Sequence, residues 1–421
     1  MNARVIIGVS IAALITVFSG FVGAAENNHV VRRALLQEAL AKQLTRGLQA
    51  EDAMWPQRMS FVTRMSNHNA DAKSLLDAAA KEWRRVIGSP RYDALHGGFF
   101  STENATPTSK RLCEQALMTD VLLDAVQISN DVVCREAAKK SLDFVLRDLR
   151  LAAGGFAASN AFFVTAESPQ GQRDETVIPA WNGLMVAALA RGSAVLGNQN
   201  YFVAAEQTEA FILTRCVTAS DGIAAIHGAL ALYQVAGSVR WLAAAIELQD
   251  RIEREFWDEA TVSYRMKERN QLPNALEIMN LLRLAAITDD DLFRARANAM
   301  LTAAIARAGV DIAENTGFLC AIDQQLGPSP HVMIVGDPAA SDTRALFAVT
   351  HRMYQPRMVI VTHAGDPVQA ELRKRFPAMV PSSKEKGKAT AYVCVGEMCN
   401  RPTTDTAGLE KQLKAISYRW E

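Results

Sequence analysis

The chain has 421 residues, of which 49% are hydrophobic and 21% are charged, and its 45 basic side chains are balanced by 45 acidic ones. This composition is typical of a globular protein with ample chain for a large core. Because the charges balance, the sequence argues against nucleic acid or an anionic membrane surface as a partner.

The N-terminal segment has a character of its own. Arg4 precedes an apolar run over residues 5–22, which ends in the small residues Gly-Ala-Ala. This order predicts a signal peptide at residues 1–25, and hence an exported, periplasmic or secreted protein whose mature chain starts near residue 25 or 26. A run of this length could also span a bilayer, so a protein anchored in the inner membrane by residues 5–22 stays open as the alternative.

Sparse cysteines and missing motifs limit the chemistry of the chain. The cysteines are Cys113, Cys134, Cys216, Cys320, Cys394 and Cys399, with no C-x-x-C pair for a redox site or a zinc ribbon. Cys394 and Cys399 either form a local disulfide or remain two unlinked buried thiols. Neither a metal-binding histidine or acid motif nor a glycine-rich phosphate loop occurs, so we expect no metal and no cofactor.

The stretch DETVIPAWNGLMVAALARGSAVL, residues 174–196, predicts the central helix. Pro179 suits the first helical position because it has no N–H group to leave unpaired there. The apolar surface that follows is broad enough to require burial almost all round. Since the first turn contains Trp181 and Asn182, we expect the N-terminal end of this helix to face a cleft.

Helical hairpins follow one another up to residue 327. Apolar periodicity predicts helices at two segments within 30–65 and then at about 72–87, 111–129, 131–150, 179–196, 199–217, 222–236, 239–257, 273–287, 290–308 and 310–326. Such hairpins must close on one another to bury their apolar faces, which predicts a mainly α protein with an (α/α)6 barrel of six helical hairpins over residues 26–327. The repeated Gly-Gly-Phe at 97–99 and 154–156 would let the backbone turn tightly beside the cleft.

A different pattern begins after residue 327. Short β-branched runs occur at 331–335, 358–361 and 391–394, with helices predicted from Ser341 and near 367–376. They predict a small α/β C-terminal subdomain over residues 328–421, packed on the barrel and closed by a helix from Gly408 onward. The turn at 335–338 resembles one that follows a nucleotide-binding strand, but without a phosphate-binding motif it does not predict nucleotide binding.

Five motifs resemble one known family in order. They are DETVIPAWNGLMVAAL, ASDGIAAIHGALALYQ, NALEIMNLLRLA, HVMIVGDPAASDTRAL and ATAYVCVGEMCNRPTTD. They are similar to the barrel and C-terminal parts of the thioredoxin-fused α/α-barrel family typified by the spermatogenesis-associated thioredoxin-like protein. The family normally begins with a thioredoxin-like domain, whose place the export signal takes here. Its barrel is similar to those of six-hairpin glycosidases and N-acylglucosamine 2-epimerases, which implies a carbohydrate-type cleft and a small saccharide as the candidate ligand.

Several residues of the family pattern are replaced in this chain. The family's Tyr-Asp-His-Val-Gly-Gly-Gly-Phe-His reads YDALHGGFF at 92–100, so Ala94 and Phe100 replace its two histidines and His96 replaces a glycine. The family's acidic loop lacks carboxylates here, at 157–161. These losses favour a binding or scaffold protein that is degenerate in catalytic residues. The alternative is a carbohydrate-active enzyme, a glycoside hydrolase or a sugar epimerase or isomerase, that uses cleft carboxylates.

Glu114, Asp174 and His96 are the candidate catalytic residues. Sugar chemistry needs two carboxylates across a glycosidic bond, or a paired acid and base. Glu114 and Asp174 are the acids that the resemblance retains, and His96 is the imidazole closest to the expected cleft mouth. A structural ion pair would equally explain Glu114, and helix capping or dipole interaction would explain Asp174.

The candidate ligand-binding residues are Trp181, Asn182, Asp221, His227 and Asn274. We expect Trp181 to pack inside the barrel with its ring edge at the cleft floor, and the two amides to bond either a ligand hydroxyl or the backbone. Asp221 stands at a helix start, where capping is the structural alternative. His227 is either an acid–base group or a core histidine with satisfied hydrogen bonds.

Overall fold

A computed structural model describes the chain over 25–46, 54–68, 72–101, 109–161, 172–266, 272–308, 312, 314–327, 329–363, 365, 367–377, 379 and 382–416. Residues 1–24 of the predicted signal peptide lie outside the described residues. Within the described ranges, no helix is both long and apolar enough to cross a membrane.

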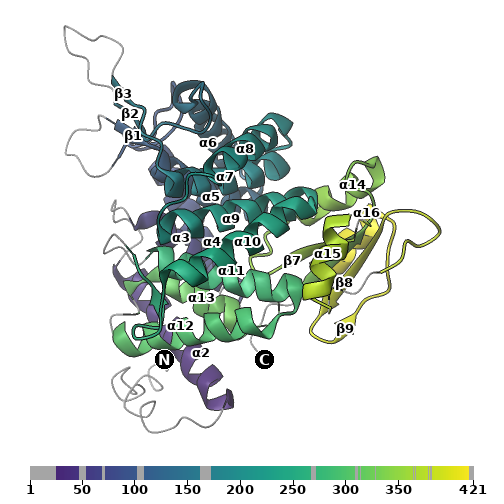
Figure 1. Cartoon of the computed structure of the whole chain (residues 1–421). Helices are drawn as coiled ribbons and strands as arrows, with labels where there is room; N and C mark the ends of the chain where they lie inside the picture. Colours follow the sequence, from purple (N-terminus) through teal and green to yellow (C-terminus); the bar gives the residue numbers. More distant parts are fainter. Residues whose placement is uncertain are drawn as a thin grey trace.

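Two concentric rings of helices build the main body (Figure 1). In the described part of the chain the inner ring consists of α3 (Trp55–Ser66), α5 (Leu112–Ser129), α7 (Pro179–Leu196), α9 (Ala219–Ala236), α11 (Leu272–Thr288) and α13 (Thr316–Leu326). Each inner helix packs against the next, and α13 closes the ring on α3. Outside them lie α2 (Ala25–Arg46), α4 (Ala72–Ile87), α6 (Val132–Phe144), α8 (Gln199–Ile212), α10 (Val239–Phe256) and α12 (Asp291–Ala308). The predicted (α/α)6 barrel is confirmed.

Helix α7 is enclosed by α5, α8 and α9, and its residues from Met185 to Ala190 are buried, as its apolar surface predicts. Pro179 begins the helix. A Cβ atom on Gly183 would lie 2.5 Å from the backbone of Ala224 in α9, so the glycine permits the close approach of the two helices.

The two ends of the barrel differ. Because each inner helix is separated from the next by an antiparallel outer helix, all inner helices run in the same direction. The end at which they begin, called the mouth here, bears the antiparallel sheet β1 (Ser109–Arg111), β2 (Ser159–Ala161) and β3 (Gln172–Asp174). It also bears the short pair β4 (Trp257–Asp258) and β5 (Ser263–Tyr264), which precedes α11.

The C-terminal elements form a sheet with the order β7-β6-β8-β9. Its elements are β6 (His331–Val335), α14 (Ser341–Thr350), β7 (Val359–His363), α15 (Pro367–Arg375), β8 (Thr390–Val395), β9 (Met398–Cys399) and α16 (Thr406–Lys414). The predicted unit of strand, helix and parallel strand is present as β6, α14 and β7. A disulfide between Cys394 and Cys399, the first of the two possibilities left open, joins β8 to β9.

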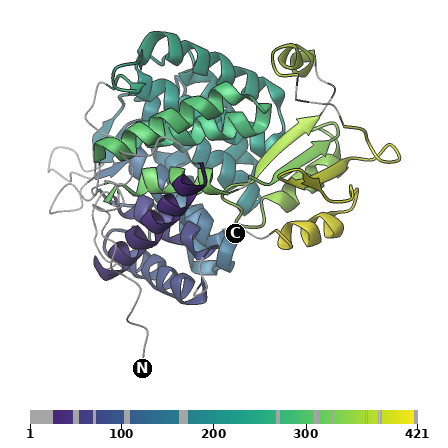
Figure 2. The ribbon, with the colours of Figure 1, turned by 90° about the horizontal axis from the view of Figure 1, so that it is seen from below.

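This C-terminal module covers the end of the barrel opposite the mouth (Figure 2). The backbone N–H of Thr362 donates to the Tyr233 hydroxyl at 3.0 Å, and the His351 Nε2 atom lies 3.1 Å from the Gln234 carbonyl oxygen. Both barrel residues stand in the last turn of α9. Val359 of β7 belongs to the barrel's own hydrophobic core. The domain boundary after residue 327 therefore stays a prediction.

Candidate functional site

Stripes of partly exposed side chains lead from the mouth into the barrel. On α5 and α7 they are Cys113, Leu117 and Asp120, and Trp181, Leu184 and Arg191. Their spacing places each set along one face of its helix. The Asp120 and Arg191 side chains remain 39% and 27% exposed, although both lie in the interior of inner helices. Accessible surface on these two side chains indicates that solvent reaches the interior of the inner ring, a space called the lumen here.

An ion-pair network forms one wall of the lumen. The Arg191 guanidinium pairs with Asp120 through Nη1 and with Asp124 through Nη2, where the distance to Oδ1 is 2.7 Å. The same Nη2 donates to the Gln127 side-chain oxygen at 3.0 Å. Burial raises the pKa of Asp124 to about 6 despite the attraction of Arg191. The network therefore contains a carboxyl group whose charged form is disfavoured by burial and favoured by its ion pair with Arg191.

His227 and Arg283 face this network across the lumen. Arg283 Nη1 lies 3.2 Å from His227 Nδ1, and since a guanidinium only donates, the neutral imidazole must keep its proton on Nε2. Burial lowers the pKa of His227 to about 4, so the ring is neutral at pH 7. Both side chains interact electrostatically with Asp120 of α5, a helix that neighbours neither α9 nor α11 in the ring. His227 thus accepts through Nδ1 and keeps its proton on Nε2, so it is not a free base.

The floor of the lumen is polar and involves the C-terminal module. Arg64 Nε lies 3.1 Å from Asp323 Oδ2, and His68 Nε2 lies 2.7 Å from the other oxygen of that carboxylate. Arg64 also donates to the Pro356 carbonyl oxygen at 3.4 Å. Tyr354 interacts electrostatically with Arg64, and burial raises its pKa well above the usual range. The segment between α14 and β7 therefore closes the lumen from below.

Glu114 and Trp181 lie at the mouth. Glu114 is buried in the first turn of α5 and accepts a hydrogen bond of 3.0 Å from the Ser101 hydroxyl. The Trp181 ring is partly exposed, and the Arg111 guanidinium lies 4.9 Å from its centroid. Trp181 thus lies at the entrance, partly buried against the barrel core, and the expected position of its ring edge at the cleft floor stays a prediction.

Asp174 lies at the same end of the barrel and is hydrogen-bonded to Thr176. The strand register sets Arg111, Ser159 and Asp174 directly opposite one another across β1, β2 and β3. Directly opposite residues project to the same face of a sheet, and two strand spacings amount to about 9.5 Å. Asp174 is exposed and accepts from the Thr176 backbone at 3.0 Å. Hydrogen bonds from Thr176 hold the pKa of Asp174 below its usual range.

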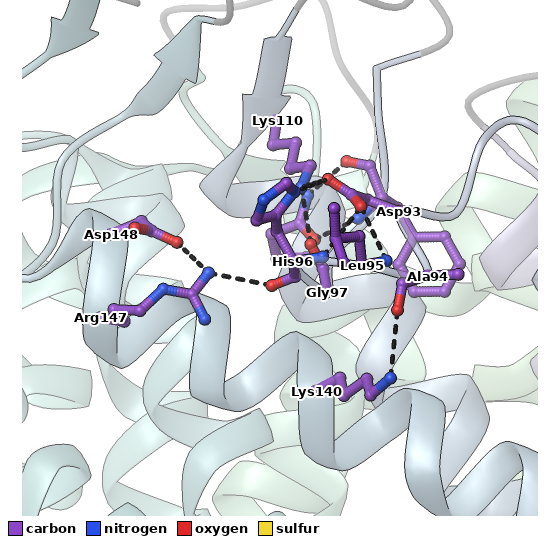
Figure 3. Close-up of polar contacts among 11 residues, drawn as sticks. Asp93, Ala94, Leu95, His96, Gly97, Lys110, Lys140, Arg147 and Asp148 are labelled. Atoms are coloured by element: carbon purple, nitrogen blue, oxygen red, sulfur yellow. Dashed lines mark hydrogen bonds and ion pairs between the residues drawn. The ribbon is translucent and has the colours of Figure 1, made fainter. Parts of the chain in front are cut away.

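His96 belongs to a loop whose backbone accepts hydrogen bonds from Lys140 of α6 and from Arg147 (Figure 3). Asp93 accepts from the His96 backbone at 2.9 Å, from His96 Nδ1 at 3.2 Å and from Lys110 Nζ at 2.7 Å. Lys110 is fully buried over the rings of Phe100 and Phe144. Burial raises the pKa of Asp93, but the hydrogen bonds from Lys110 and His96 and the Lys110 charge together outweigh it and bring the pKa to about 2. The His96 side chain remains 56% exposed.

Two of the predicted ligand-binding side chains, Asn182 and Asp221, are hydrogen-bonded to backbone groups of the protein. Asn182 is buried, accepts from the Phe156 N–H at 2.8 Å and donates to the Phe156 carbonyl at 3.1 Å. Asp221 forms a capping box with Thr218 and accepts from the Ala180 N–H of α7 at 3.1 Å. The structural alternatives noted for both residues therefore account for their hydrogen bonds.

Asn274 differs from them. It is buried near the start of α11, and among the described residues its Oδ1 atom has no hydrogen-bond partner. An amide oxygen in this condition is free to accept a hydrogen bond from a ligand hydroxyl or from water.

Sequence reasoning missed the lumen charges, which are Asp120, Asp124, Arg191 and Arg283. The signal that could have revealed them is a charged residue within a helix that is apolar all round. Burial of an unpaired charge is costly, so such residues must find partners across the barrel or face solvent inside it.

A metal centre is not apparent in the structure. In the described ranges, no group of three or more histidine, cysteine, aspartate and glutamate side chains is arranged to hold a metal ion. A pocket of about 520 Å³ lies beside the C-terminal end of α6, and its lining includes Arg147, Arg150 and Gln207 but none of the predicted site residues.

The chain is similar in sequence to spermatogenesis-associated protein 20. The human protein is 28% identical over 293 residues, which cover 58% of this chain and 37% of the human protein. An uncharacterised protein of Caenorhabditis elegans is 28% identical over 294 residues, with 58% of this chain and 38% of that protein covered. The chain thus spans well under half of these relatives' lengths. The resemblance drawn from the motifs is confirmed, and no family model matches the chain.

Solved structures of carbohydrate-active barrels are also similar to this fold. Cellobiose 2-epimerase from Bacillus thermoamylovorans has a TM-score of 0.49 and 9% sequence identity. The match covers 58% of this chain and 73% of that enzyme. Cellobiose 2-epimerase from Spirochaeta thermophila has a TM-score of 0.47 and 14% sequence identity. The match covers 64% of this chain and 84% of that enzyme. A glycoside hydrolase family 76 mannosidase from Bacteroides thetaiotaomicron has a TM-score of 0.41 and 16% sequence identity. The match covers 62% of this chain and 70% of that protein. Similarity at this level is no guide to substrate or reaction.

Proposed function

We propose that this chain is an exported binding or scaffold protein that takes a small saccharide into the barrel lumen. The observation that supports the proposal is the accessible surface of Asp120 and Arg191 deep inside the inner ring. Trp181 at the entrance and polar side chains within are the kinds of groups that orient a polyhydroxylated ligand, through ring contact and hydrogen bonds.

Binding without turnover is favoured because one candidate catalytic acid, Glu114, and two of the predicted ligand-binding residues are already hydrogen-bonded within the protein. Glu114 is buried against Ser101, and Asp221 is used as a cap. His227 uses its Nδ1 lone pair to accept from Arg283, so the ring has no free basic nitrogen. A general base must reach the proton that it abstracts, so groups already bonded within the protein are less available for this role.

Obstruction of the lumen tests the proposal. Isothermal titration calorimetry with a panel of mono- and disaccharides is expected to find a ligand for the wild type. Leu184→Trp would fill the channel beside Trp181 and lower the affinity at least tenfold. Val203→Trp, on an exposed position of the outer helix α8, is the matched control and should keep wild-type affinity. Equal affinities in both variants, or no binding by the wild type, would refute the lumen as the saccharide site.

A carbohydrate-active enzyme is the second candidate, favoured by the placement of Asp124 beside Asp120 and Arg191. Burial raises the pKa of the Asp124 carboxyl, as in groups that act as general acids. In this case Glu114 and Asp174 would serve as the catalytic acids, with His96 assisting. NMR detection of product from any bound sugar would overturn the non-catalytic proposal. Asp124→Asn, Glu114→Gln and Asp174→Asn would then identify the acid through loss of turnover in folded protein.

Export is tested separately. N-terminal sequencing of protein from the periplasm or the medium is expected to find a mature chain that starts near Ala25 or Glu26. Soluble cytosolic protein with an intact Met1 would contradict export, and an intact N-terminus in the membrane fraction would favour the anchor formed by residues 5–22.

A further inference from the structure

Arg283 differs from the other arginines of the lumen. Within the described ranges its guanidinium forms no ion pair with a carboxylate, and the hydrogen bond from Nη1 goes to His227. That imidazole is neutral at pH 7 because burial lowers its pKa to about 4. The positive charge of Arg283 is therefore not compensated by its neighbour.

The remaining lumen arginines are compensated. Arg191 pairs with both Asp120 and Asp124, and Arg64 pairs with Asp323. Arg283 has only the longer-range attraction of Asp120, so its guanidinium keeps donor groups for an anion that enters the lumen.

Arg283 is positioned to meet a ligand. Its side chain is partly exposed on α11, and it interacts electrostatically with Arg191 of α7 and Asp120 of α5. These residues belong to the exposed stripes that lead inward from the mouth, so the same space connects Arg283 to the entrance. The His227 hydrogen bond fixes one arm of the guanidinium and leaves its other N–H groups available.

We propose that Arg283 binds the carboxylate of a sugar acid in the lumen, with His227 as its positioning residue. This inference names the ligand class of the saccharide site proposed above and rests on that proposal. A planar guanidinium matches a carboxylate through two parallel N–H···O bonds. A single guanidinium beside Asp120 suits a singly charged carboxylate better than a phosphate ester, which bears between one and two charges near pH 7.

Calorimetry on the full chain with D-glucuronate, D-glucose and D-glucose 6-phosphate tests the inference. Wild-type protein should bind glucuronate about 10- to 100-fold more tightly than glucose, as expected for charge-assisted hydrogen bonds. Arg283→Met should lower the affinity for glucuronate far more than that for glucose and so abolish this preference. Arg283→Lys keeps the positive charge but loses the two parallel N–H donors of the guanidinium, so it should retain part of the preference for glucuronate. Arg294→Met, on the outer helix α12, is the matched control and should change neither affinity.

The outcomes separate the inference from the proposed function. Equal affinities for glucuronate and glucose, or a preference that survives Arg283→Met, would overturn the sugar-acid assignment and leave the saccharide site intact. Tighter binding of the phosphate ester than of glucuronate would also overturn it. Failure to bind any sugar would refute both proposals. Thermal unfolding of each variant verifies folding, and Arg283→Gln provides a second neutral variant if Arg283→Met is unstable.

Discussion

Asn182 joins two hairpins through a single amide group. It holds both backbone groups of Phe156, in the loop before β2, from the first turn of α7. Asn182→Ala should lower the free energy of unfolding by about 1–3 kcal/mol, because the Phe156 N–H is left buried without a partner. Urea denaturation measures the loss. Asn274→Ala is the control, and a loss there as large as at Asn182 would contradict the bracing role.

Trp181 illustrates how partial exposure limits the stability contribution of a large side chain. A fully buried tryptophan costs roughly 3–5 kcal/mol when truncated to alanine. Trp83 is 1% exposed and should show this full cost, whereas Trp181→Ala should cost about 1–3 kcal/mol, since part of its ring already contacts solvent. Thermal and urea unfolding of both variants give the comparison. Equal losses would mean that the Trp181 ring is buried and does not line the entrance.

At the scale of elements, the contact between α7 and α9 depends on a missing side chain. A Cβ atom on Gly183 would lie 2.5 Å from backbone atoms of Ala224, which cannot move without shifting α9. At Gly192 the nearest atom is the end of the Leu142 side chain, at 2.4 Å, which can change rotamer. Both positions are helical, so alanine gains about 1 kcal/mol of helix propensity at each.

We therefore expect Gly183→Ala to destabilise the protein by about 1–3 kcal/mol, the usual cost of overpacking, and to do so more than Gly192→Ala. Equilibrium unfolding in urea tests the pair. If the two variants unfold at the same urea concentration, the backbone approach is not what requires the glycine.

On the scale of the whole molecule, His351 reports on the docking of the C-terminal module. Its Nε2–H donates to Gln234 of the barrel, and burial lowers its pKa to about 4. An unfolded chain protonates this histidine below a pH of about 6.5, whereas the folded chain keeps it neutral down to about 4. Between these values the unfolded state binds more protons, so acidification weakens the fold.

The pH dependence of His351→Gln provides the test. Relative to this variant, the wild type should lose on the order of 3 kcal/mol of stability between pH 7 and pH 4, most of it below pH 6.5. Urea unfolding at pH 7, 5.5 and 4 measures the difference. Parallel pH profiles for the two proteins would show that the imidazole titrates normally and that the module does not enclose it.

The sequence by itself determined the barrel, the order of the C-terminal elements and the central helix. Apolar residues at helical spacing, interrupted by short turns, leave few other ways to bury consecutive hairpins, and Pro179 marks the start of α7 at the residue observed. These features depend on local spacing, which a single sequence displays directly. Capping and bracing by Asp221 and Asn182 were accordingly among the alternatives that the sequence offered.

Only the tertiary structure decided which side chains meet inside the ring. Asp120, Arg191, His227 and Arg283 come from four inner helices and are brought together by closure of the barrel. The C-terminal module contacts Arg64 at one end of the ring, whereas Trp181 lies beside Arg111 at the other end. Contacts across a lumen depend on the rotation of each helix about its own axis. That rotation is set by packing between helices, such as the approach of α7 to α9 at Gly183. The spacing of residues within one helix does not determine it.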